Sequence, residues 1–135
     1  MNTLCFDFGN TRMKVACFQQ AKLTEVFIID KNDPEIIDAL IKKYNPQKTI
    51  LSSVINHNPE IENLLAAQTK FHKLSYLSKL PFTTPVGKPE TIGADRLALA
   101  AAVVYFYPKQ NTLVIGMGSC VTYNFINKEH EFLGG

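Results

Sequence analysis

The chain has no tryptophan and only three cysteines, and no two of these form a Cys-x-x-Cys pair. Cys5 and Cys17 lie inside apolar segments, so we expect buried free thiols rather than disulfides or zinc ligands. The three histidines have no metal-ligand spacing and are expected at the surface or half-buried. These absences argue against a disulfide scaffold and a zinc centre, and they fit a reducing compartment.

Charge and long hydrophobic runs are also scarce. Charged residues make up 19% of the chain, the net charge is +2, and no block of like charge occurs. A nucleic-acid partner is therefore not expected. The longest apolar run, from Leu97 to Tyr107, is shorter than the roughly 20 residues that span a bilayer. Asp7 and the lack of a basic stretch exclude a signal peptide at the N-terminus. We expect a cytoplasmic protein without membrane contact.

The common nucleotide-binding loops are missing as well. Neither a Walker A motif nor a Gly-x-Gly-x-x-Gly motif occurs anywhere in the 135 residues. Apolar residues make up 46% of the chain, which is ample for a hydrophobic core. The length fits one domain, or one domain and part of another.

The pattern of apolar residues predicts alternating strands and helices, typical of an α/β fold. Strands are expected at 2–8, 13–19, 22–29, 48–54, 71–74, 112–116, 121–127 and 131–133. Asp33-Pro34 and Asn58-Pro59 each provide a capping side chain followed by proline, which predicts two helix starts. A helix over 92–107 is apolar nearly all round and is expected to be buried. The proline-rich stretch 80–90 predicts an exposed, ordered loop.

Two segments repeat the same pattern of strand, glycine turn and strand. The first runs from Leu4 to Phe18 and the second from Leu113 to Ile126. A turn of this kind exposes backbone N–H groups and hydroxyls around a small cavity, which suits an anion. The repeat predicts a duplicated fold that holds a polyphosphate from both sides. We expect one domain over 1–110 and the truncated beginning of a second over 111–135.

The first turn carries residues suited to phosphate and metal binding. Asp7 is expected at the end of a buried strand, where a carboxylate is costly unless it meets a cation such as Mg²⁺. Asn10 and Thr11 can donate to phosphate oxygens, and Lys14 adds positive charge. An ordinary Gly-Asn hairpin turn with a solvated aspartate explains the same residues. The residues alone leave both interpretations open.

Asp95 and Arg96 fall in the first turn of the predicted helix 92–107. The helix dipole favours an acid there, which by itself explains Asp95. A positive charge at that end is unfavourable, so Arg96 needs a partner such as an acid or an anionic ligand. Together a carboxylate and a guanidinium can act as a general base and a carboxylate clamp.

With these motifs in place, the chain resembles the type III pantothenate kinases of the acetate-kinase, sugar-kinase, chaperone and actin superfamily. Asp7-x-Gly9-Asn10-Thr11-x-x-Lys14 is similar to the family's first phosphate loop. Gly93-Ala94-Asp95-Arg96 is similar to its substrate motif, and the stretch 116–122 stands where the family has its second phosphate loop. The resemblance covers the whole chain but only about the first half of a typical member.

The resemblance implies a ribonuclease-H-like fold with a mixed sheet and a cytoplasmic homodimer. It implies ATP-dependent phosphorylation of pantothenate to 4′-phosphopantothenate, the first step of coenzyme A biosynthesis, with Asp95 as the base. ATP and its phosphates would be bound by Asp7, Phe8, Gly9, Asn10, Thr11, Arg12, Met13, Lys14 and Ser119. Pantothenate would be bound by Gly93, Ala94, Asp95 and Arg96. Asp7 would lie near Mg²⁺, and a monovalent cation, K⁺ or NH₄⁺, is also implied.

Three positions depart from the family pattern. Gly116 stands where the family has the aspartate that holds the monovalent cation, Ser119 replaces a threonine that contacts ATP, and Val86 replaces a substrate-contacting tyrosine. These departures leave open a degenerate, non-enzymatic homologue that acts as a binding or regulatory module. Another kinase or phosphatase of the superfamily, with a different anionic acceptor, is a third reading. The 135-residue chain alone is not expected to catalyse this phosphorylation.

Overall fold

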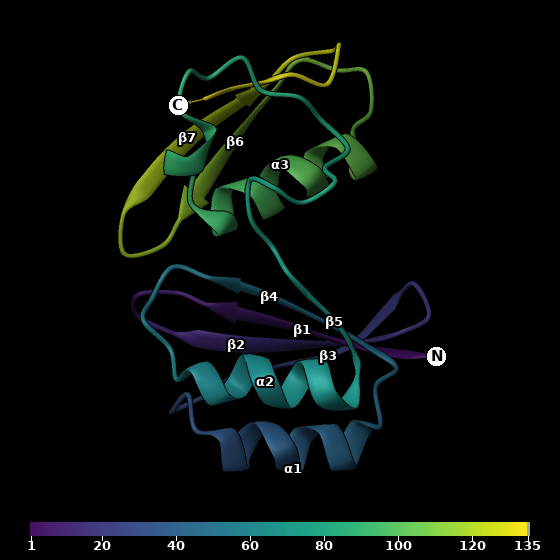
Figure 1. Cartoon of the computed structure of the whole chain (residues 1–135). Helices are drawn as coiled ribbons and strands as arrows, with labels where there is room; N and C mark the ends of the chain where they lie inside the picture. Colours follow the sequence, from purple (N-terminus) through teal and green to yellow (C-terminus); the bar gives the residue numbers. More distant parts are fainter. Residues whose placement is uncertain (135) are drawn as a thin grey trace. The chain divides into compact units, whose positions relative to one another are not determined.

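The computed structural model of the chain describes residues 1–134 and forms two compact units, Met1–Lys73 and Leu74–Gly135. The first unit contains a five-stranded sheet and two helices, and the second contains a three-stranded sheet and one long helix (Figure 1). No helix within the described residues is long and apolar enough to cross a membrane.

The first unit has a mixed sheet with the strand order β3-β2-β1-β4-β5. The strands β1, β2 and β3 pair antiparallel, whereas β1, β4 and β5 pair parallel. Their bounds are β1 Asn2–Phe8, β2 Met13–Gln19, β3 Lys22–Ile29, β4 Lys48–Ser53 and β5 Lys70–Lys73. This order and this mixture of directions are the ribonuclease-H-like arrangement, so the expected fold class is confirmed.

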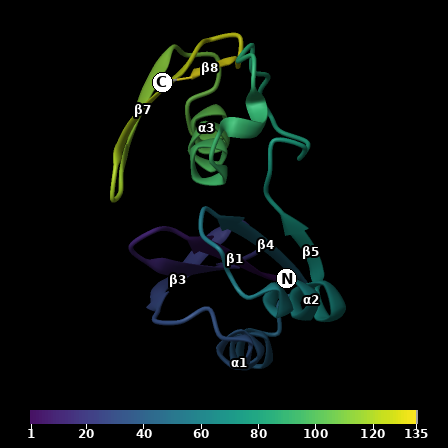
Figure 2. The same ribbon diagram turned by 60° about the vertical axis from the view of Figure 1, so that its left-hand side comes forward.

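Two helices, α1 (Pro34–Tyr44) and α2 (Pro59–Gln68), lie side by side on one face of this sheet (Figures 1 and 2). Both begin as predicted: the side chain of Asp33 accepts a hydrogen bond from the N–H of Glu35, and that of Asn58 from the N–H of Glu60. The core between sheet and helices is made of Leu4, Phe6, Phe8, Val15, Cys17, Ile29, Ile37, Ile41, Leu51, Ile61 and Leu65.

The second unit packs one helix on an antiparallel sheet with the order β6-β7-β8. Its elements are the 3₁₀ turn η1 Pro89–Thr91, the helix α3 Ala94–Phe106, and the strands β6 Thr112–Met117, β7 Val121–Ile126 and β8 Phe132–Gly134. The helix lies against β6 and β7. Its core consists of Phe82, Ile92, Leu97, Ala100, Val103, Ile126 and Phe132.

The expectation that this helix is buried all round is wrong. Only one face of α3 is buried, and Tyr105 and Phe106 are 74% and 68% exposed. The reason is that a small sheet covers one side of a helix and leaves the other to solvent. The helix also begins at Ala94, not at Ile92, because Ile92 and Gly93 have an extended backbone between the 3₁₀ turn and the helix. The expected domain boundary at 110 stays a prediction about the longer protein; here α3 belongs to the same compact unit as β6 and β7.

Candidate functional site

The turn that joins β1 to β2 holds the first group of predicted residues. The N–H of Gly9 donates to the carbonyl of Arg12 at 2.9 Å and closes the turn. A Cβ at position 9 would lie 3.1 Å from that carbonyl oxygen, so glycine is the residue that fits the close approach. Asn10, Thr11 and Arg12 are exposed at the tip. The turn therefore presents an amide, a hydroxyl and a guanidinium to solvent, as an anion site requires.

Asp7 and Lys14 are direct register partners at the turn end of the β1–β2 pair. Both are exposed, because neighbouring residues in a strand point to opposite faces and the face of Phe8 is the one covered by the helices. The expectation of a costly buried aspartate is therefore wrong, although the carboxylate and the ammonium do lie beside the turn. Phe8 is fully buried, so only its backbone is available to a ligand, and Met13 is half-buried.

A histidine network next to this turn was not expected from the sequence. The N–H of Val54 donates to the carbonyl of Phe8 at 3.0 Å, which places the segment after β4 beside the turn. The His57 ring packs edge-on against the Phe8 ring, with centroids 5.8 Å apart. Its Nδ1 lies 2.9 Å from Ser53 Oγ and its Nε2 lies 2.7 Å from Glu62 Oε2. The imidazole is 7% exposed.

The second group of predicted residues forms the start of α3. Gly93 is the N-cap residue and has no side chain to cap the helix. Asp95 lies in the first turn, is exposed, and accepts a hydrogen bond from the backbone N–H of Arg96 at 2.9 Å. Because the helix N-terminus carries partial positive charge, it stabilises this carboxylate. Asp95 is thus held at the surface of the unit.

Arg96 finds its partner on β7. Its Nε donates to Oδ1 of Asn124 at 2.7 Å, and its guanidinium carbon lies 5.5 Å from the centre of the Phe132 ring. Among residues 1–134, no carboxylate forms an ion pair with this side chain. Of the two expected kinds of partner, an acid and an anionic ligand, the described residues provide no acid, and a neutral amide contacts the guanidinium instead. Asn124 itself is fully buried and was not among the predicted site residues.

The second glycine turn lies between β6 and β7. The N–H of Gly118 donates to the carbonyl of Cys120 at 3.2 Å, and Ser119 is exposed at the tip. At Gly116 a Cβ would lie only 2.6 Å from Thr122 Oγ1 and 3.1 Å from Leu99 Cδ1. There is no room for a side chain at this position without a shift of its neighbours.

Val86 lies in the loop that precedes η1 and is half-buried. This loop is tied to the last strand: the Thr84 hydroxyl donates to the carbonyl of Phe132 at 2.9 Å, and the N–H of Phe132 donates to the carbonyl of Thr83 at 2.7 Å. The loop 80–90 is therefore ordered, as expected, but Phe82 is buried in the core. Val86 and the start of α3 belong to the same unit, whereas the Asp7–Lys14 turn belongs to the other.

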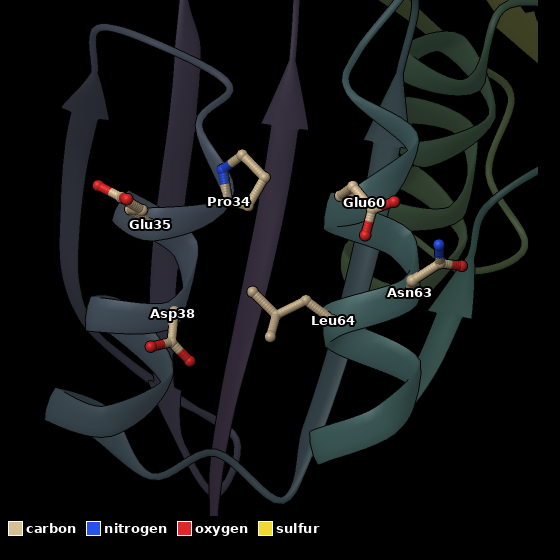
Figure 3. A pocket seen from close by; sticks show the side chains of 6 residues that line it. All are labelled: Pro34, Glu35, Asp38, Glu60, Asn63 and Leu64. Atoms are coloured by element: carbon tan, nitrogen blue, oxygen red, sulfur yellow. The ribbon is translucent and has the colours of Figure 1, made fainter.

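Two hollows of the surface lie apart from most of the predicted site residues. One of about 490 Å³ lies between α1 and α2, where Leu64 points from α2 toward α1 (Figure 3). It is lined by Pro34, Glu35, Asp38, Glu60, Asn63 and Leu64. Lys42 pairs with Asp38 at 2.8 Å, which is ordinary surface chemistry. A second hollow, of about 450 Å³, is lined by Met13, which is the one residue of its lining that was predicted to belong to the site.

No cluster of three metal-ligating side chains occurs within the described part of the chain.

Comparison with known proteins assigns the β1–β2 turn and the start of α3 to the sequence of one family. The family model described as type III pantothenate kinase matches residues 3–135. A curated type III pantothenate kinase from Christiangramia forsetii is 40% identical over 134 residues, and one from Flavobacterium johnsoniae is 35% identical over 134 residues. Each alignment covers 98% of this chain and 55% of the relative, so the chain spans about half the length of these relatives.

Among solved structures, YeaZ from Pseudomonas aeruginosa aligns with a TM-score of 0.42 at 9% identity, over 99% of this chain and 64% of that one. This likeness is too loose to add to the assignment. The sequence match, by contrast, runs through both glycine turns and the start of α3. The chain belongs to the type III pantothenate kinase family.

Proposed function

We propose that the protein to which this chain belongs transfers the γ-phosphoryl group of ATP to the primary hydroxyl of pantothenate. The observation that carries the proposal is the family match over residues 3–135, which includes every motif residue singled out above. In the reaction the acceptor oxygen forms a bond to the γ-phosphorus, the bond to the leaving ADP oxygen breaks, and the hydroxyl proton passes to a base. Such a transfer depends mainly on positioning and charge neutralisation.

The β1–β2 turn is the proposed phosphate site. Its glycine allows close approach of the backbone, and the exposed Asn10 and Thr11 can donate to phosphate oxygens. Lys14 and Arg12 supply positive charge at the same end of the hairpin. Ser119, at the tip of the second turn, is proposed to add a hydroxyl to the nucleotide site. These contacts orient the γ-phosphoryl group and offset its negative charge.

Asp7 suits a role beside a magnesium ion. Its carboxylate is exposed at the end of β1 and provides the hard oxygen ligand that Mg²⁺ prefers. One carboxylate is enough when phosphate oxygens and water complete the shell. When bound, Mg²⁺ would neutralise charge on the β- and γ-phosphates. The monovalent cation implied by the resemblance finds no such support, because Gly116 has no carboxylate and no space for one.

The start of α3 is the proposed acceptor site. Asp95 would accept the proton of the pantothenate hydroxyl, and Arg96 would bind the pantothenate carboxylate. Gly93 and Ala94 would shape the site without blocking it, and Val86 would offer an apolar contact from the neighbouring loop. The exposure of Asp95 and the neutral environment of Arg96 support these roles.

We also propose that residues 111–135 begin a second domain of the same kind. The pairing of β6 with β7 matches that of β1 with β2: Leu113, Ile115 and Met117 stand opposite Phe125, Tyr123 and Val121, as Leu4, Phe6 and Phe8 stand opposite Cys17, Val15 and Met13. In the first unit the six residues of β1 and β2 belong to the core cluster, except Met13, which is half-buried and packs against it. In the second unit the corresponding residues are exposed.

The replacement Asp95→Asn in the full-length protein tests the proposed function. We expect pantothenate phosphorylation to fall by at least about a hundredfold, because general-base catalysis contributes about 10²–10⁴-fold. Nucleotide binding, measured by titration calorimetry, should stay unchanged. Asp30→Asn, an exposed aspartate in the first unit, is the matched control and should keep wild-type activity.

Three results would contradict the proposal or a part of it. Full activity of the Asp95→Asn variant would remove Asp95 as the base. Wild-type protein that binds ATP but phosphorylates no pantothenate, with or without K⁺, would favour the non-enzymatic reading. Phosphorylation of another anionic acceptor instead would favour a different kinase of the superfamily.

A further inference from the structure

Arg96, in the first turn of α3, has a neutral side chain as its hydrogen-bond partner. Its Nε donates to the side-chain oxygen of Asn124, not to a carboxylate. The ring of Phe132 lies under its guanidinium at 5.5 Å. These two contacts, one polar and one aromatic, hold the group in place from β7 and β8 without cancelling its charge.

Hydrogen bonding fixes the orientation of Asn124. Its side chain is fully buried, and its Nδ2 donates to the carbonyl of Val114 at 3.3 Å and to Thr122 Oγ1 at 3.0 Å. A backbone carbonyl can only accept, so the NH₂ end of the amide must point toward β6. The oxygen end is then the one that faces Arg96. The flipped amide would set two acceptors against each other and leave the NH₂ group against the guanidinium.

The amide has an electrostatic consequence that a carboxylate in its place would not have. A carboxylate at 2.7 Å would pair with Arg96 and offset most of its charge. The amide oxygen orients the group but carries no net charge. The one acidic neighbour on the same helix, Asp95, is exposed and uses Oδ1 to accept from the backbone N–H of Arg96. Arg96 thus keeps its positive charge for a ligand.

We infer that Asn124 is a positioning residue that orients Arg96 and leaves its charge available to an anionic acceptor, and so sets the preference of the enzyme for an acceptor that carries a carboxylate. The inference rests on the proposed function, since it assigns a determinant of specificity to the acceptor site. Asn124 touches neither the acceptor nor ATP in this scheme. It acts through Arg96.

The replacement Asn124→Asp in the full-length protein provides the test. It keeps the size of the side chain and an oxygen facing Arg96, but it adds a negative charge. We expect KM for pantothenate to rise about tenfold, because hydrogen bonds to charged groups are worth about a factor of ten or more. KM for ATP should not change. A neutral acceptor, with a primary alcohol in place of the pantothenate carboxylate, should be phosphorylated as well as by the wild type.

The decisive quantity is the ratio of kcat/KM for pantothenate to kcat/KM for the neutral alcohol. Partial misfolding lowers both values equally, so the ratio reports specificity even if the new carboxylate repels the Val114 carbonyl. We expect the ratio to fall about tenfold in Asn124→Asp. If that variant does not fold, Asn124→Ser, which shortens the side chain without adding charge, should still lower the ratio. Asn63→Asp makes the same chemical change at an exposed position of α2 and should leave the ratio at its wild-type value.

The outcomes separate the inference from the function on which it rests. A ratio that stays at the wild-type value in both Asn124 variants, with wild-type enzyme active on pantothenate, would overturn the role of Asn124 alone. In an Arg96→Met background the Asn124→Asp change should have no further effect on the ratio; an undiminished effect there would show that Asn124 does not act through Arg96. Wild-type protein inactive on both acceptors would overturn the proposed function itself.

Discussion

At the scale of residues, the neighbours of Gly116 leave no space for a side chain at this position. The position stands where the resemblance places an aspartate, and the structure fills the corresponding space with the Thr122 hydroxyl and a methyl group of Leu99. The same hydroxyl accepts a hydrogen bond from Asn124, which in turn holds Arg96. The loss of the carboxylate and the neutral partner of Arg96 are therefore parts of one packed arrangement.

The change Gly116→Ala is expected to destabilise the protein by about 1–3 kcal/mol, which is typical of overpacking. A Cβ would lie 2.6 Å from Thr122 Oγ1, far inside van der Waals contact, so strand or side chain must shift. Urea unfolding followed by circular dichroism measures the difference. Gly87→Ala is the control, because nothing lies within 4 Å of its added Cβ, and it should be neutral or slightly stabilising. Equal effects of the two changes would contradict this account.

At the scale of elements, the link from β4 to α2 is held by polar contacts next to the β1–β2 turn. His57 lies between Ser53, the last residue of β4, and Glu62 on α2, and Lys73 on β5 also reaches Glu62 at 3.2 Å. Partial burial acts to raise the pKa of Glu62, but the hydrogen bonds from His57 and Lys73 together outweigh it. The pKa of this carboxyl therefore lies below its usual value of 4.5.

This lowered pKa predicts a pH-dependent contribution to stability. A carboxyl whose pKa is lower in the folded state stabilises the fold above its unfolded pKa, and the contribution is lost as the pH falls through the folded value. Glu62→Gln should therefore cost about 0.5 kcal/mol at pH 7, a modest amount because the side chain is 29% exposed. Below pH 4 the cost should shrink toward zero. Unfolding free energies measured from pH 3 to 7 check this, and a difference independent of pH would refute it.

At the scale of the whole molecule, the three-stranded sheet exposes an apolar face. Seven large apolar side chains point away from α3, with exposures from 37% for Phe125 to 83% for Met117: Leu113, Ile115, Met117, Val121, Tyr123, Phe125 and Leu133. A contiguous apolar patch of this kind marks an interaction surface. Its counterpart in the first unit is a packed core under two helices. The curated relatives are nearly twice as long as the chain, which fits a second domain that covers this face.

The change Ile115→Thr should therefore have different effects in two lengths of the protein. In the 135-residue chain Ile115 is 48% exposed, so the change should cost less than about 0.5 kcal/mol. In a chain of the full family length, where we expect Ile115 to be buried, it should cost about 2 kcal/mol. Leu97→Ala, at a position that is 1% exposed here, should be costly in both. A small cost of Ile115→Thr in the longer chain would exclude the covered face.

Much of the fold follows from local patterns, and the reason is that these patterns act over a few residues. The paired caps and prolines at 33–34 and 58–59 start both helices of the first unit where they were predicted, since a cap needs only the adjacent N–H groups. The alternation of apolar and polar residues predicts the bounds of β1, β2 and β3 as the structure has them. The helix at 94–106 was predicted less well, because its exposed face depends on how much sheet covers it, which no local pattern reports.

The sequence by itself determined the elements, the two glycine turns, and the residues that the family resemblance singles out, because each is encoded in a short run of the chain. Only the tertiary structure decided their partners. Arg96 and Asn124 are 28 positions apart and meet because α3 packs on β7. His57 meets Phe8 because β4 pairs with β1 in parallel register. Contacts of this kind depend on sheet register and on the packing of helices against sheets, and these are set by the whole chain at once.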